Sequence, residues 1–270
     1  MPPPPVLPPP PPYEPPVWPI PSLRLRVDDL AHPGAQIFFQ HVNPYNALTS
    51  AVLTVFDWLY TLETVPHEVE TIVLVLRSMP GVAHTFGSDN YKEIHFSLDW
   101  IKQCEARAPH EINGVLVHEM VHCFQYNGKG KAPGGLIEGI ADWIRLHAEL
   151  APPHWTEGKG TKWDAGYEAT GFFLDFIEQT HERGFVRSLN LEMRNNKYKE
   201  EMFKKISGRG LSEWWTLYQA HLGKKIPNND PEKTPGGGDD KKENINAVGD
   251  PDKKTAKTNA IIRNLWQKMT

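Results

Sequence analysis

The chain has 270 residues, enough for one sizeable hydrophobic core, and its formal net charge is −4. This slightly acidic balance gives no basis for binding nucleic acid or an anionic membrane surface, and no run of about 18 apolar residues could cross a membrane. Two cysteines, Cys104 and Cys123, could form one bridge but are too few for a disulfide framework.

The two ends of the chain differ in composition from its middle. Thirteen of the 25 prolines lie within residues 1–21, which predicts an extended tail without a core. In this tail, Pro10–Tyr13 has the Pro-Pro-x-Tyr form that suits WW or SH3 partners, although a plain spacer is the alternative. Residues 224–270 predict a polar low-complexity tail with a short helix at 260–269, so the folded domain is predicted over 22–223.

In chain order, the predicted elements place strands before helices. Alternating or β-branched patterns predict strands at 23–27 and 71–76 and an edge or near-edge strand at 93–97 (EIHFS). Apolar periodicity predicts helices at 46–62, 110–126, 134–149, 166–182, 198–206 and 211–222. A mixed sheet followed by a mainly helical half is an α+β arrangement.

Residues 116–128 (LVHEMVHCFQYNG) place two histidines and a glutamate in an otherwise apolar helical segment. His118 and His122 are four residues apart, so they lie on one helix face and could share a metal ion, with Glu119 beside them. This is the HExxH arrangement, in which the histidines bind zinc and the glutamate is the general base. Satisfied core histidines are the alternative, so the interpretation needs a third ligand.

Two carboxylates lie four residues apart on the next predicted helix, among apolar neighbours. Glu138 and Asp142 need a cationic partner there, because buried unpaired charges are costly. We predict Glu138 as the third zinc ligand and Asp142 as the acceptor of a ring N–H of His118. The alternatives are Asp142 as ligand in place of Glu138, or a solvated face. A metzincin is excluded, because Gln125 and Gly128 stand where that class has Gly and His.

The chain resembles the basic secretory protein family, zinc peptidases known from plants with relatives in fungi and bacteria. The stretches that carry the resemblance are GVAHTFGSDNYKEIHFSLDWI, HEMVHCFQYNGKGKAPGGLIEGIADWIRL, WDAGYEATGFFLDFI and FVRSLNLEMRN, and it spans about residues 23–222. It implies a zincin-like, gluzincin-type metallopeptidase fold with one Zn²⁺ at His118, His122 and Glu138, and with Glu119 as base.

The resemblance also suggests a donor for the oxyanion that forms when an amide carbonyl is attacked. In gluzincins of the aminopeptidase type, a tyrosine near the start of the helix after the third-ligand helix has this role, and Tyr167 occupies the corresponding place. The alternative is a core tyrosine at a helix start; His154 and His181 are weaker candidates. Gly134 and Gly135, ahead of the ligand helix, predict a close backbone approach near the cleft.

The chain departs from the family in charge and targeting. Family members are typically exported and often basic, whereas this chain is acidic and its first residues lack the basic and apolar regions of a signal peptide. The absence of a signal peptide favours a cytoplasmic location, whereas members of the family are typically secreted. The two tails lie outside the resemblance.

Together, these patterns predict zinc-dependent hydrolysis of peptide bonds in a peptide or protein substrate. The strand EIHFS would be the edge along which an extended peptide pairs. One alternative is a non-catalytic zinc protein that recruits WW or SH3 partners through its Pro-rich head. Another is a zinc hydrolase of a non-peptide substrate, since the sequence does not reveal the shape of the pocket.

Overall fold

The computed structural model describes residues 17–181 and 183–224. The Pro10–Tyr13 motif, nearly all of the predicted C-terminal tail and the predicted helix at 260–269 lie outside these residues. Among the described residues, none of the helices is both long enough and apolar enough to cross a membrane.

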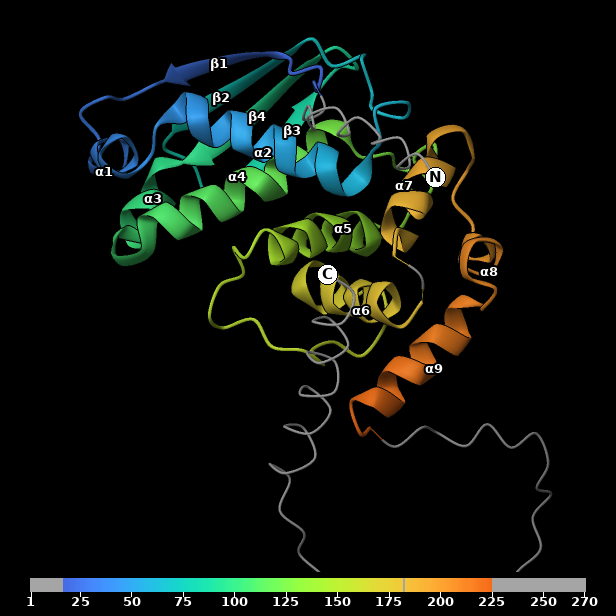
Figure 1. Cartoon of the computed structure of the whole chain (residues 1–270). Coiled ribbons are helices and arrows are strands. Elements are labelled where there is room, and N and C mark those ends of the chain that lie inside the picture. The colour runs from blue at the N-terminus through green and yellow to red at the C-terminus, as the bar shows by residue number, and fades with distance from the viewer. Residues whose placement is uncertain (1–16, 182, 225–270) are drawn as a thin grey trace, which may run out of the picture. The chain divides into compact units, whose positions relative to one another are not determined.

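A four-stranded mixed sheet forms one layer of the domain (Figure 1). Its order is β1-β2-β4-β3, with β1 parallel to β2, β2 parallel to β4, and β3 antiparallel to β4. The strands are β1 (Ser22–Val27), β2 (Thr71–Arg77), β3 (Ala83–Gly87) and β4 (Tyr91–Ser97). Alternate residues of the two central strands, among them Leu74 and Ile94, are fully buried in the core.

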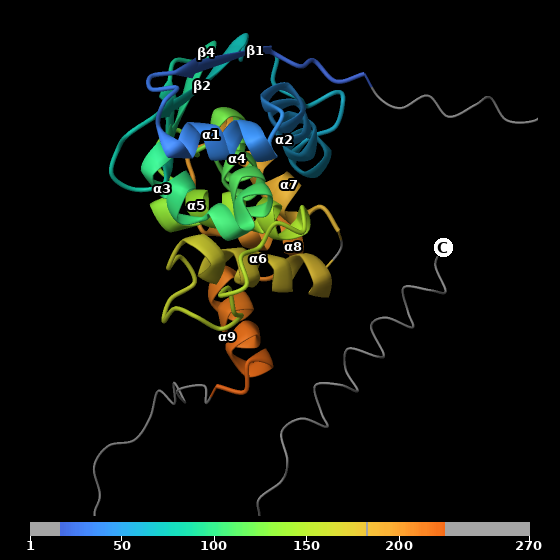
Figure 2. The ribbon, with the colours of Figure 1, turned by 90° about the vertical axis from the view of Figure 1, so that its left-hand side faces the viewer.

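The helices lie on one side of the sheet (Figures 1 and 2). Helices α2 and α4 lie next to it, α5 lies beyond α4, and α6 lies beyond α5. Their bounds are α1 (Pro33–His41), α2 (Pro44–Leu59), α3 (Leu98–Gln103), α4 (Ala108–Phe124), α5 (Gly134–His147), α6 (Tyr167–Thr180), α7 (Phe185–Asn195), α8 (Glu201–Ser207) and α9 (Leu211–His221). The predicted α+β class, with a mixed sheet followed by a mainly helical half, is confirmed.

EIHFS is a near-edge strand, which the prediction allowed, but the expectation that it forms the open edge for peptide pairing is wrong. These residues belong to β4, which is paired on both sides, with β2 and with β3. Strand β3 (AHTFG), which the sequence patterns did not predict, is the outer strand on this side of the sheet, with β1 at the opposite edge. At five residues it is short, as edge strands often are, and it has no β-branched run to mark it.

Three helices, α1, α3 and α7, were also missing from the prediction, and for α7 the structure shows a reason. Helix α7 begins at Phe185, and Gly184, the residue before it, has no side chain to act as a cap. The carboxylate of Glu178 on α6 does so instead, by accepting hydrogen bonds from the backbone N–H groups of Gly184 and of Val186, the latter at 3.0 Å. A cap that comes from another helix leaves no local signal in the sequence.

Candidate metal centre

The centre is built on α4 and α5, which pack against each other. His118 and His122 lie on one face of α4, and Glu138 lies on the second turn of α5. His118 Nε2 is 3.1 Å from Glu138 Oε2 and 3.2 Å from His122 Nε2, and His122 Nε2 is 3.5 Å from the same carboxylate oxygen. These three side chains form the one group of its kind among the described residues that could hold a metal ion.

The spacing of the three atoms fits a zinc ion. Bonds of about 2.0–2.2 Å in a tetrahedral arrangement place neighbouring ligand atoms about 3.3 Å apart. The three observed separations of 3.1, 3.2 and 3.5 Å lie around that value. Two imidazoles and a carboxylate are also the donor set of catalytic zinc sites, which keep a further position open.

Asp142 fixes the ring of His118. Its Oδ1 accepts a hydrogen bond from His118 Nδ1 at 2.6 Å, and both side chains are almost fully buried. Because a carboxylate only accepts, the Nδ1 atom carries the proton and Nε2 is directed to the centre. This is the contact that we predicted for Asp142, and the distances make Glu138, not Asp142, the third member of the cluster.

Gln125 fixes the ring of His122 in the same way, a contact that the sequence patterns did not predict. Its side-chain oxygen accepts a hydrogen bond from His122 Nδ1, and its side-chain nitrogen donates to the carbonyl of Ile137 at 3.0 Å. Gln125 therefore orients the ring and also links the end of α4 to α5. The signal available in the sequence was its position three residues after His122, one turn along the helix.

The charges of the centre are strongly coupled. Burial opposes a charge on His118, but the hydrogen bonds that its ring donates to Asp142 and Glu138 outweigh this effect and raise the pKa of His118 to about 9. Burial also opposes the charge on Glu138, which would raise its pKa. Hydrogen bonds with His118 and His122 outweigh this effect and hold the pKa of Glu138 far below its usual range. A metal ion that binds here must displace the proton on His118 Nε2, since imidazole binds metals only when neutral.

Glu119 lies at the same level of α4, 5% exposed. Its Oε2 accepts a hydrogen bond from Thr85 Oγ1 at 2.7 Å, and the same hydroxyl is 3.0 Å from the Glu119 carbonyl oxygen. Thr85 belongs to the edge strand β3, so the sequence patterns did not connect it with the centre. Glu119 does not belong to the cluster of three potential metal ligands. In the HExxH arrangement the glutamate acts as a base beside the metal and does not bind it.

Tyr167 lies at the centre, at the first residue of α6. Its ring is nearly parallel to that of His118, with the centroids 6.2 Å apart. Its side chain is exposed, and the negative charge of Glu138 raises the pKa of its phenol, so the hydroxyl can donate a hydrogen bond at neutral pH. Its φ of 47° is uncommon for a bulky residue and marks a strained position of the kind found at functional sites.

Close contact between α5 and the start of α6 brings Tyr167 to this place. A Cβ on Gly135 would lie 1.9 Å from the carbonyl oxygen of Asp164, so only glycine fits there, whereas Gly134 has open space around it. The predicted close approach therefore holds for Gly135 alone. His181 lies at the other end of α6 against Trp214, about 20 Å away along the 14-residue helix. Tyr167 therefore lies beside His118, whereas His181 lies at the far end of α6.

Neither cysteine takes part in the centre. Cys104 and Cys123 are both free, so the bridge that the sequence allowed is absent. Cys123 faces the core, as predicted from its position one residue after His122, and burial raises the pKa of its thiol far above the usual value. It is therefore an inert core residue and not a fourth ligand.

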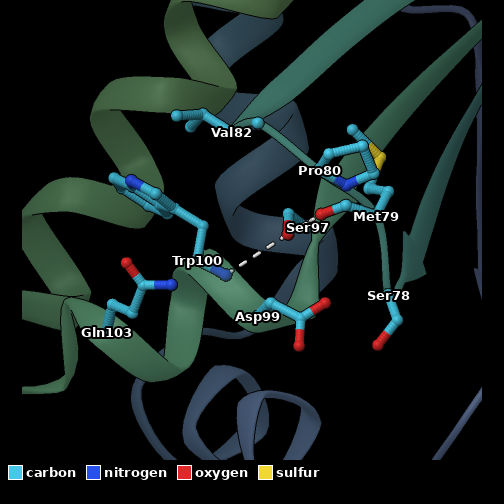
Figure 3. Close-up of a pocket in the computed structure, with 9 residues that line it drawn as sticks. Ser78, Met79, Pro80, Val82, Ser97, Asp99, Trp100 and Gln103 are labelled. Atoms are coloured by element: carbon cyan, nitrogen blue, oxygen red, sulfur yellow. Dashed lines mark hydrogen bonds between the residues drawn. The ribbon is translucent and has the colours of Figure 1, made fainter.

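An open hollow of about 680 Å³ lies away from the centre, between the β2–β3 loop and α3 (Figure 3). Ser97 organises it: its hydroxyl donates to the carbonyl of Met79 at 2.8 Å and accepts from the backbone N–H of Trp100 at 3.2 Å. None of the clustered residues of α4 or α5 lines it. The candidate site is therefore assigned from the converging ligand atoms and not from this hollow.

Comparison with known proteins agrees with this geometry. A family model described as peptidase of plants and bacteria matches residues 20–218. The chain belongs to this family. It is the basic secretory protein family that the sequence resembles, and the match includes every residue of the centre. No curated protein and no solved structure matches the chain significantly.

Replacing Asp142 with Asn is expected to weaken zinc binding about 10- to 100-fold, because the neutral amide no longer stabilises the His118 ring as a ligand. Competition with a chromogenic chelator measures the affinity. Asp175→Asn is the matched control. Asp175 lies on α6 and its Oδ1 is 2.8 Å from His147 Nε2, so it is also an aspartate paired with a histidine, but outside the cluster. Equal zinc affinity of Asp142→Asn and the parent would show that Asp142 only packs the helix.

Proposed function

We propose that this protein is a zinc-dependent peptidase that cleaves peptide bonds with Glu119 as general base. One observation carries the proposal: His118, His122 and Glu138 converge at ligand spacing beside a buried glutamate, in a chain that belongs to a peptidase family. Zinc bound there would polarise the scissile carbonyl and lower the pKa of a bound water to about 7.

The residues of the chain then have distinct roles. His118, His122 and Glu138 hold the metal, while Asp142 and Gln125 orient the two imidazole rings through their Nδ1 atoms. The Glu119 carboxylate takes the proton of the attacking water and delivers it to the nitrogen of the departing amine. Tyr167 donates a hydrogen bond from its phenolic hydroxyl to the oxyanion and keeps its proton, consistent with its raised pKa.

Strand β3 supports a peptide as the substrate. It is one of the two outer strands of the sheet, and the side chain of its Thr85 contacts Glu119, so this edge strand runs beside the base. An extended peptide can add to such an edge through backbone hydrogen bonds, which places a scissile bond near the centre without dependence on one side chain. The proposed pairing therefore moves from EIHFS, where the sequence placed it, to AHTFG.

Removal and return of the metal test the proposal. A chelator is expected to abolish cleavage of a mixed peptide library, and about one equivalent of zinc per chain is expected to restore it, because the ligand set holds one ion. Glu119→Gln purified in parallel shows whether a contaminating peptidase contributes. A zinc-loaded protein that leaves every peptide intact would contradict the proposal and favour a hydrolase of another substrate or a binding protein.

A further inference from the structure

Thr85 connects the edge strand β3 to the glutamate of the candidate centre. It is 34 residues away from Glu119 in sequence, and its hydroxyl lies 2.7 Å from Glu119 Oε2. The Glu119 carbonyl oxygen, at 3.0 Å, is the second acceptor within reach of the same hydroxyl. Since a threonine hydroxyl has one hydrogen, it serves one acceptor at a time, and the shorter distance favours the charged carboxylate.

This hydrogen bond comes from a rigid support. Thr85 is paired with Ile94 in the antiparallel β3–β4 ladder, which fixes its backbone. Its β-branched side chain also has few χ1 rotamers, so the direction of the hydroxyl is restricted. Within the described part of the chain, Thr85 is the one side chain that forms a hydrogen bond with this carboxylate. Glu119 would otherwise be held only by packing, with its χ angles free to vary.

We infer that Thr85 is a positioning residue for Glu119, a role that rests on the proposed function. Its hydroxyl holds Oε2, so that the other carboxylate oxygen is presented to the attacking water in one orientation. A general base works only within hydrogen-bond reach of the proton that it takes, so this orientation affects the rate of the chemical step. Because Thr85 belongs to the strand along which the peptide would pair, one element aligns both the base and the substrate.

Two substitutions separate this hydrogen bond from packing. Thr85→Val keeps the shape of the side chain and removes the donor, whereas Thr85→Ser keeps the donor and removes a methyl group. Thr85→Val is expected to lower kcat about 10- to 100-fold, the usual effect of losing a hydrogen bond to a charged group, with KM and zinc content unchanged. Thr85→Ser is expected to recover kcat to within a few-fold of the parent.

Thr71→Val is the matched control, since Thr71 is a half-buried strand threonine at the start of β2, paired with Tyr91 and not with the centre. Crystal structures give a readout independent of activity: in Thr85→Val the Glu119 carboxylate is expected to occupy more than one rotamer, and in Thr85→Ser a single one. An unchanged kcat and a single rotamer in Thr85→Val would overturn the inference. So would equal losses in the Val and Ser variants, which would indicate packing alone.

These outcomes are distinct from failure of the proposed function. If the parent protein cleaves peptides while Thr85→Val matches it in kcat, only the role of Thr85 is wrong. If the parent binds no zinc and cleaves no peptide, the proposed function is overturned, and the inference about Thr85 is overturned with it.

Discussion

Replacing Glu119 with Gln is expected to lower kcat for peptide cleavage about 10³-fold or more, because the carboxylate acts as base in the attack and as acid in the departure of the amine. Glutamine has nearly the same size and can still accept the hydrogen bond from Thr85, so the local fold is preserved. It cannot take a proton. Zinc content should stay at that of the parent, because Glu119 is not among the clustered ligand atoms.

Steady-state kinetics on one defined peptide, with metal analysis of the same samples, measure both effects. Glu93→Gln is the matched control, since Glu93 is likewise a largely shielded glutamate but lies on β4, where its carboxylate is 2.7 Å from His95 Nε2. Its kcat is expected to stay near that of the parent. Bound zinc with near-normal turnover in Glu119→Gln would show that another group is the base.

Helical spacing allowed much of the candidate site to be predicted from the sequence. Pairs four residues apart must share a helix face, so the pairing of His118 with His122, and of Glu138 with Asp142, follows from the spacing alone. The contacts between α4 and α5 then bring the two pairs together, with Glu138 Oε2 3.1 Å from His118 Nε2. The partner that the apolar neighbours of the carboxylates implied is His118, which forms hydrogen bonds with both Asp142 and Glu138 and whose pKa they raise.

The residues that were missed contact the centre through tertiary structure. Thr85 reaches Glu119 from a strand 34 residues earlier, and no periodicity within either segment relates them. The order of the strands could not be predicted for the same reason. β3 and β4 are neighbours in sequence, but β3 lies at the edge of the sheet only because β4, and not β3, pairs with β2. Glu178 caps α7 from α6, and Gln125 reaches the carbonyl of Ile137 on α5. Local patterns cannot contain these contacts.

Replacing Glu138 with Ala is expected to reduce zinc content from about one ion per chain to almost none. Loss of supporting residues alone weakens metal sites about 10- to 100-fold, so loss of a direct ligand should exceed that. The remaining imidazoles bind less well for a second reason. Without the Glu138 carboxylate, their positions depend only on Asp142 and Gln125. Metal analysis by mass spectrometry after dialysis against dilute chelator measures the content.

Glu157→Ala is a suitable control, because Glu157 is a partly exposed glutamate that pairs with His221 at 3.4 Å. It should keep one zinc per chain. Full zinc in Glu138→Ala would exclude Glu138 as the third ligand and direct attention to Asp142, whose Oδ1 is 2.6 Å from His118 Nδ1. No zinc in the parent, even with zinc offered at neutral pH, would mean that the cluster is a core hydrogen-bond network, and the peptidase proposal would be wrong although the chain belongs to the family.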